Sequence, residues 1–417
     1  MKELTEEKPE QKDRVKFESM NVTTGDIYPK RKNTLKFPYK IVIIIILYII
    51  IALIIISIII FLSKISDIEC EIGGDDKSLL CDNEHKNRCS KCGAGSEIVN
   101  GKWILNYSFK AVYHTSKNNE IAKIINNSSN LIYMNIDGLD IEPSIYYNFT
   151  TPGNHTVFYL MNTTNLTSIN SLFYRINKLI YIYFSEIFNS ENITDMGKLF
   201  YDCSSLKSIN IKNLNTKNVI NMEYMFSICS ELKAIEIDYY KFNTENVINM
   251  SNMFLNCFKL TSLNLSSFNT QKVLNMNSMF SGCTSITSIY LSNLDTYNVI
   301  DLGYIFSKCY SIVSLDLTNF DTSKAIHMNN MFAYCYNLKF LDLSHFETHN
   351  VVNMRGMFIG CNSLTSLDLS SFNTENTINM NSMFSECASL ISINMENFNT
   401  KNVQNMENMF SHCTSLI

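Results

Sequence analysis

The chain has 417 residues, of which 46% are hydrophobic and 18% charged, so it is long enough for several domains and too apolar for a disordered protein. A formal net charge of −5 argues against a nucleic-acid-binding protein, because phosphate recognition needs clustered Lys and Arg. The seven His are scattered, and the motifs of zinc proteases, P-loop enzymes and serine hydrolases are missing. We therefore expect no enzyme, no cofactor and no metal site.

An apolar stretch occupies residues 41–62 and is interrupted only by Tyr48 and Ser57. At about 1.5 Å per residue, a helix of this length crosses a bilayer. A cleaved signal peptide is the alternative, but its apolar core would be only about 7–15 residues long. We predict an uncleaved signal anchor. Basic residues precede the stretch and acidic residues follow it, which places the N-terminus in the cytoplasm and the repeats outside the cell. We therefore predict a single-pass type II membrane protein in which residues 1–40 are a mostly disordered cytoplasmic tail.

Residues 63–100 contain four cysteines in the spacing C-x10-C-x7-C-x2-C. With His85 close by, they could bind zinc. Outside the cell, two disulfides are the better interpretation, and the spacing leaves their pairing open. We predict a short disulfide-linked stalk. Its candidate residues are Cys70, Cys81, Cys89 and Cys92.

Residues 101–165 alternate apolar and polar side chains between Asp-Gly and Pro-Gly turns, which predicts a small β-rich domain. The sequon N-x-S/T occurs eight times between residues 101 and 195 but only twice in the 222 residues that follow. This concentration indicates a glycosylated segment close to the membrane. The candidate sites are Asn106, Asn126, Asn127, Asn148, Asn154, Asn162, Asn165 and Asn192.

From residue 166 to residue 417 the chain repeats itself with a period of 26 residues. Nine cysteines mark the period, and only the step from Cys229 to Cys257 is longer, at 28 residues, because the letters DYYK stand where later copies have two residues. A fixed period of this size predicts a solenoid of stacked repeats. The ninth copy stops at Leu416-Ile417, so we expect either a truncated product or a frayed last repeat.

One copy, residues 249–270, shows what each position of the repeat does, and we call these positions slots. Its apolar residues fall at i, i+3, i+4 and i+7, which predicts a short helix with Asn249 as its N-cap. The pattern L-x-x-L-x-L that follows predicts a strand, and Thr270 is expected to bond backbone groups of a neighbouring turn. The four helix slots are Met250, Met253, Phe254 and Cys257.

The Met and Cys slots also admit chemical interpretations. The alternation of Met with Phe at helical spacing favours core packing over copper binding by thioethers. Equal slots in successive turns should lie about 8–10 Å apart, beyond the limit of about 7 Å between the Cα atoms of a disulfide. We therefore expect buried free thiols in the repeats.

The motif C-x-x-L-x-x-L-x-L-S-x-F-x-T-x-N-V-x-N-M-x-x-M-F resembles the 26-residue repeat of BspA-like leucine-rich-repeat surface proteins, over residues 170–417. The resemblance implies a surface-exposed solenoid, linked in several members to adhesion, host contact or matrix binding, with no catalytic residues. The predicted fold class is therefore an α/β leucine-rich-repeat solenoid with one short strand and one short helix per repeat. The small β-rich domain and a transmembrane helix would precede it.

A function should reside on the concave sheet face, where the outward strand residues differ between repeats. Three aspartates would form an acidic row near two aromatic residues, suited to a cationic ligand or a divalent ion; a merely solvated polar face is the alternative. We expect adhesion, or recognition of a protein or glycan ligand at the cell surface. Two other hypotheses stay open: a passive structural or antigenic coat protein, and a membrane-tethered cytosolic scaffold. The candidate ligand-binding residues are Tyr290, Asp316, Phe340, Asp342 and Asp368.

Overall fold

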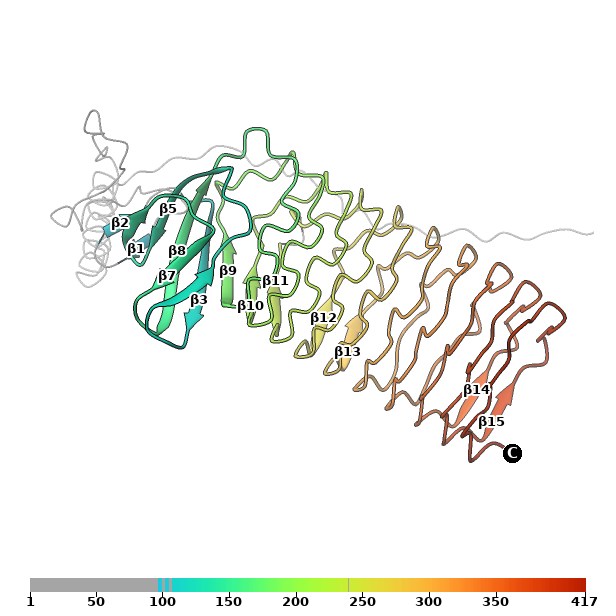
Figure 1. The fold of residues 1–417 in the computed structure, drawn as a ribbon. Coiled ribbons are helices and arrows are strands. Elements are labelled where there is room, and N and C mark those ends of the chain that lie inside the picture. The colour runs from blue at the N-terminus through green and yellow to red at the C-terminus, as the bar shows by residue number, and fades with distance from the viewer. Residues whose placement is uncertain (1–96, 100–101, 105–106, 239) are drawn as a thin grey trace, which may run out of the picture. The chain divides into compact units, whose positions relative to one another are not determined.

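A computed structural model describes residues 97–99, 102–104, 107–238 and 240–417. These residues form strands and turns and contain no helix, so the expected α/β class is wrong and the repeats build a β-solenoid (Figure 1). The predicted cytoplasmic tail, the apolar stretch 41–62 and the four stalk cysteines lie outside the described residues. Within the part that is described, no helix is long and apolar enough to cross a membrane.

Fifteen strands are assigned in the described residues, and the last six are only three residues long. The first eight precede the repeats: β1 (Glu97–Val99), β2 (Lys102–Ile104), β3 (Phe109–Thr115), β4 (Glu120–Lys123), β5 (Leu131–Ile136), β6 (Leu139–Ile141), β7 (Tyr146–Phe149) and β8 (Gly153–Met161). The others are β9 (Leu179–Phe184), β10 (Ser208–Asn210), β11 (Ala234–Glu236), β12 (Ser262–Asn264), β13 (Ser288–Tyr290), β14 (Ser366–Asp368) and β15 (Ser392–Asn394).

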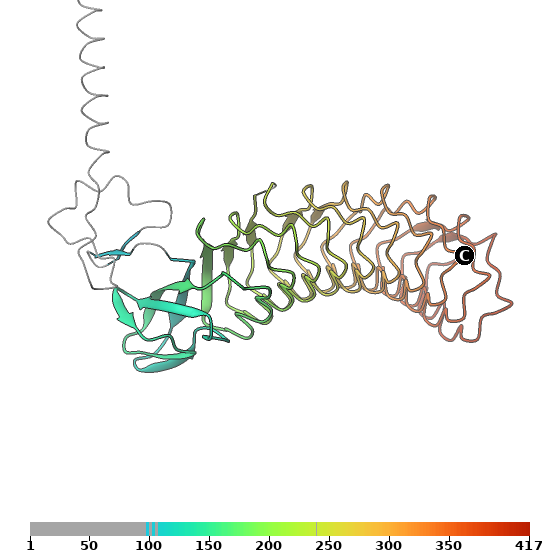
Figure 2. The same ribbon diagram turned by 90° about the horizontal axis from the view of Figure 1, so that it is seen from above.

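One seven-stranded sheet joins the N-terminal strands to the solenoid, in the order β11-β10-β9-β3-β8-β5-β6. Strand β9 pairs antiparallel with β3 and parallel with β10. The antiparallel strands therefore cover the edge that the first coil would otherwise expose, and an exposed edge is a template for aggregation. The coils then follow one another in a row, as the view turned by 90° also shows (Figure 2).

The segment predicted as a helix is instead a run of tight turns bonded to the next coil. In residues 250–257, alternate N–H groups from Met250 to Asn256 donate to carbonyls one coil further on, at 2.8–3.0 Å. The N–H groups of Met253, Leu255 and Cys257 donate three residues back, as from Met253 to Met250 at 3.3 Å. An α-helix would use these donors for bonds four residues back. Pairing between coils therefore replaces the helix.

Positive φ angles at two positions per coil, four residues apart, also exclude a helix. Asn252 and Asn256 both have φ of 59°, and the second position is glycine at Gly282 (73°) and Gly360 (71°). The expected helix slots nevertheless point inward, with Met250, Met253, Phe254 and Cys257 at most 1% exposed. The apolar spacing thus predicted which side chains are buried and was wrong about the backbone.

Polar side chains also form ladders along the solenoid. Asn249 accepts a hydrogen bond from the Ser251 N–H at 2.9 Å, so the predicted cap residue caps a turn instead of a helix. Buried Thr296 donates its hydroxyl to the Asp321 carbonyl of the next coil at 2.8 Å, which confirms the role expected for the Thr slot. A further ladder was not anticipated: asparagines such as Asn246 donate their side-chain amide to a carbonyl of the preceding coil.

The main core is an apolar column that runs from the N-terminal strands into the solenoid. The Phe slot stacks coil upon coil, with ring centroids 5.5 Å apart between Phe226 and Phe254 and 5.9 Å apart between Phe254 and Phe280. Each repeat buries its apolar slots against both neighbours, so one repeat alone would lose most of its stabilising contacts.

Candidate functional site

The sheet face presents the five candidate residues in neighbouring coils, all of them exposed. Tyr290 ends β13 and Asp368 ends β14, and Asp316 and Asp342 hold the equivalent position in the two coils between them. Phe340 lies in a second column, where it bridges to Ser314. Exposed fractions of 62% for Tyr290 and 71% for Phe340 are high for aromatic side chains. The structure thus places four candidates in one column and Phe340 beside it.

Each aspartate of the row caps the turn that follows its strand. Asp316 accepts a hydrogen bond from the Thr318 N–H at 3.2 Å, and Asp342 accepts one from the Ser344 N–H at 3.0 Å. The hydroxyl and amide of Thr318 lower the pKa of Asp316, and the amide of Ser344 lowers the pKa of Asp342. The row is therefore anionic at neutral pH.

The turns do not require that charge. Asparagine fills the same slot in three other coils and makes the same bond, as from the Ser266 N–H to Asn264 at 2.9 Å. Asn210 and Asn394 accept equivalent bonds from Lys212 and Glu396. An uncharged side-chain oxygen is enough to cap the turn, so the fold does not need the negative charge of the three successive aspartates. Among the described residues, however, no three carboxylate, His or Cys groups converge as metal ligands, so the row does not form a cage for a divalent ion.

The cysteines of the repeats are free thiols, as expected. Each donates its S–H to the carbonyl of a Phe in the preceding coil, as Cys283 does to Phe254 at 3.2 Å. Burial raises the pKa of Cys283, Cys335 and Cys387 to about 12. A reactive cysteine needs the opposite shift, so these thiols are packing groups with no nucleophilic role.

The glycosylation candidates lie mostly on the surface. Asn126 is half-buried and accepts a hydrogen bond from Lys123, and Asn106 lies outside the described residues. Whether they carry sugar stays a prediction. The exposed ones are Asn127, Asn148, Asn154, Asn162, Asn165 and Asn192.

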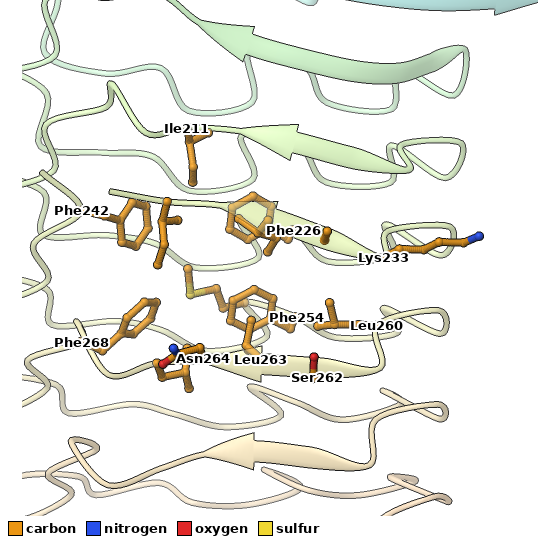
Figure 3. A pocket seen from close by; sticks show the side chains of 15 residues that line it. Ile211, Phe226, Lys233, Phe242, Phe254, Leu260, Ser262, Leu263, Asn264 and Phe268 are labelled. Atoms are coloured by element: carbon orange, nitrogen blue, oxygen red, sulfur yellow. The ribbon is translucent and has the colours of Figure 1, made fainter. Parts of the chain in front are cut away.

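A cavity that the sequence analysis missed opens between β11 and β12, where the repeat is 28 residues long. Strand β11 ends the seven-stranded sheet and β12 begins a separate sheet with β13. The same coils stay in contact elsewhere, with Phe226 and Phe254 stacked at 5.5 Å. An apolar cavity of about 230 Å³ lies between the two strands, beside the longer repeat (Figure 3). The irregular cysteine spacing was the signal that could have located it.

Comparison with known proteins gives one family. The family described as "Mycoplasma protein of unknown function, DUF285" matches residues 153–257, 230–340 and 327–417. These matches span the 26-residue repeats and confirm the resemblance to BspA-like leucine-rich-repeat surface proteins that the repeat motif indicated. No curated protein sequence matches the chain.

Two solved structures are similar to part of the chain. A leucine-rich cell surface protein from Faecalibacterium prausnitzii A2-165 is 19% identical, with a TM-score of 0.26, over 54% of this chain and 76% of that one. A leucine-rich repeat protein of T. pallidum is 16% identical, with a TM-score of 0.22, over 54% of this chain and 72% of that one.

Proposed function

We propose that this chain, which belongs to the DUF285 family, is a surface protein that recognises a cationic partner through the sheet face of its solenoid. The partner is a protein with a basic surface, and a glycan that carries positively charged amino groups is the second candidate. Display through the apolar stretch 41–62, which lies outside the described residues, stays a prediction from the sequence.

The observation that supports recognition most is the acidic row where asparagine would suffice. Asp316, Asp342 and Asp368 stand in successive coils of one column, about 4.8 Å apart from strand to strand. Such a row of like charges is unfavourable for the folded chain unless something cationic binds to it. Tyr290 and Phe340 add exposed aromatic surface beside the charges, the residue type that is enriched at binding hot spots.

The test exchanges each candidate for the residue that other coils use in the same slot. Tyr290→Asn, Asp316→Asn, Asp342→Asn and Asp368→Asn copy Asn264, and Phe340→Ser copies Ser314, so the turns keep their bonds. Binding of the full-length variant to a panel of purified matrix proteins and glycans is compared with wild type. We expect at least a tenfold loss of affinity for the partner that wild type binds.

A control variant separates this face from general charge effects. It neutralises three exposed acids elsewhere, by Glu186→Gln, Glu191→Gln and Glu375→Gln, together with Tyr146→Ser. Unchanged binding by the face variant, or an equal loss in the control, contradicts the proposal and favours the passive coat. Protease treatment of intact cells tests the hypothesis of a cytosolic scaffold. Repeats that stay protected from the protease would lie inside the cell and would support that hypothesis.

A further inference from the structure

The cavity between β11 and β12 is built almost entirely from ring and aliphatic side chains. Phe226, Phe242, Phe254 and Phe268 contribute rings from two successive coils (Figure 3). Met253 also lines the cavity. An engineered apolar cavity of about 150 Å³ stays free of water and binds benzene. At about 230 Å³ this cavity is larger, and twelve of the fifteen residues that line it are apolar. Its chemistry therefore suits a hydrocarbon group.

The width of the opening excludes a peptide strand as the occupant. A strand inserted between β11 and β12 would need about 4.8 Å of additional separation. The two coils are joined on both sides of the opening: the Lys259 N–H donates to the Ser230 carbonyl at 3.2 Å, and the rings of Phe242 and Phe268 lie 5.6 Å apart. A slim, flexible chain can enter without separating the coils.

The rim of the cavity carries one charge. Lys233 lines the end where the strands begin, and it is exposed. Among the described residues its ammonium forms no ion pair, whereas Glu236 at the far end of β11 is paired with Lys212 at 3.0 Å. Its side chain extends away from the cavity in Figure 3, and its flexible stem lets it turn toward a bound anion. An anionic group would therefore lie at the Lys233 end.

We propose that this cavity binds a medium-chain carboxylate, with the hydrocarbon between β11 and β12 and the carboxylate at Lys233. The site is independent of the acidic row, which lies in later coils. It lies beside the one repeat that is two residues longer than the others, and the other repeats form their coils without that extra length.

Calorimetric titration of the full-length protein with octanoate tests the proposal. We expect saturable binding of one octanoate per chain. Deletion of Tyr239 and Tyr240, which restores the 26-residue spacing, should close the gap and abolish binding. Ile235→Trp should reduce binding at least tenfold by filling the cavity from its half-exposed side, and it serves as a second variant if the deletion does not fold.

A charge test isolates the carboxylate. Lys233→Gln should weaken octanoate about tenfold and leave octanol binding unchanged, whereas Lys207→Gln, one coil away in the same column, should change neither. Absence of octanoate binding to wild type overturns the proposal, and so does undiminished binding to both the deletion and the Ile235→Trp variants. Equal weakening by the two lysine variants overturns the placement of the carboxylate.

Discussion

The buried cysteine ladder should make the protein sensitive to alkaline pH. Eight thiols are buried, and burial raises the pKa of each above its ordinary value, to about 12 for Cys283 and Cys335. The same thiols in the unfolded chain have a pKa of about 8.5. A raised pKa in the folded state gives stability that is fully present below pH 8.5 and is lost as the pH rises toward the folded value. Above pH 8.5 the unfolded chain releases protons that the folded chain retains.

The magnitude follows from proton linkage. Each such thiol lowers the free energy of unfolding by about 1.4 kcal/mol per pH unit above its unfolded pKa. From pH 8.5 to pH 10 the loss is therefore about 2 kcal/mol per thiol, or about 16 kcal/mol for eight. That is as large as the whole stability of a typical small domain, about 5–15 kcal/mol. We expect the solenoid to be strongly destabilised at pH 10.

Urea unfolding followed by circular dichroism between pH 7 and pH 10 measures this loss. The variant Cys309→Ala, Cys335→Ala, Cys361→Ala removes three of the thiols, so its slope against pH should be smaller by about 4 kcal/mol per pH unit. Phe306→Leu, which destabilises the same region without removing a titrating group, should keep the wild-type slope. A triple variant whose slope equals that of wild type would refute the reasoning, because tyrosines and lysines titrate equally in both chains.

Two further predictions concern single slots. Thr296→Val should lower the free energy of unfolding by about 1–3 kcal/mol because it leaves the Asp321 carbonyl unpaired, whereas Thr296→Ser keeps the bond and should cost less; equal losses in urea unfolding would contradict this. Gly282→Ala should cost about 1–3 kcal/mol, since φ is +73° and the new Cβ would lie 2.2 Å from Oδ1 of Asn256. Adding Asn256→Ala should recover only the steric part of that loss, and full recovery would rule out backbone strain as a cause.

The inward slots could be predicted from the sequence, and the backbone could not. Residues at i, i+3, i+4 and i+7 are buried both in a helix and in a run of four-residue turns, so the spacing of Met250, Met253 and Cys257 does not distinguish the two. The distinction lies in the donors, which bond between coils, and in the positive φ of Asn252 and Asn256. Asparagine at both positions was the available hint, because it tolerates that conformation better than most residues.

The outward positions of the candidate site could be predicted from the sequence, but the bonds that its side chains make could not. Strand alternation correctly gave the outward positions of Tyr290, Asp316 and Asp342. It could not show that each aspartate caps a turn, because that bond depends on the path of the chain after the strand. The cavity could not be predicted either, since two additional residues could equally have formed a surface loop without separating β11 from β12.

In this solenoid, a residue that differs from the repeat pattern indicates a function only when the fold does not require the difference. His327 replaces the usual capping Asn or Asp, yet it keeps the parallel bridges to Asp301 and Asn353, so the pairing of the coils does not depend on that side chain. The aspartate row is different, because Asn264 shows that the uncharged residue makes the same turn bond. The 28-residue repeat is different too, because the other repeats build the same coils from 26 residues. Charge in the first case and a cavity in the second are what the fold leaves unexplained, so these are the two places where we expect ligands.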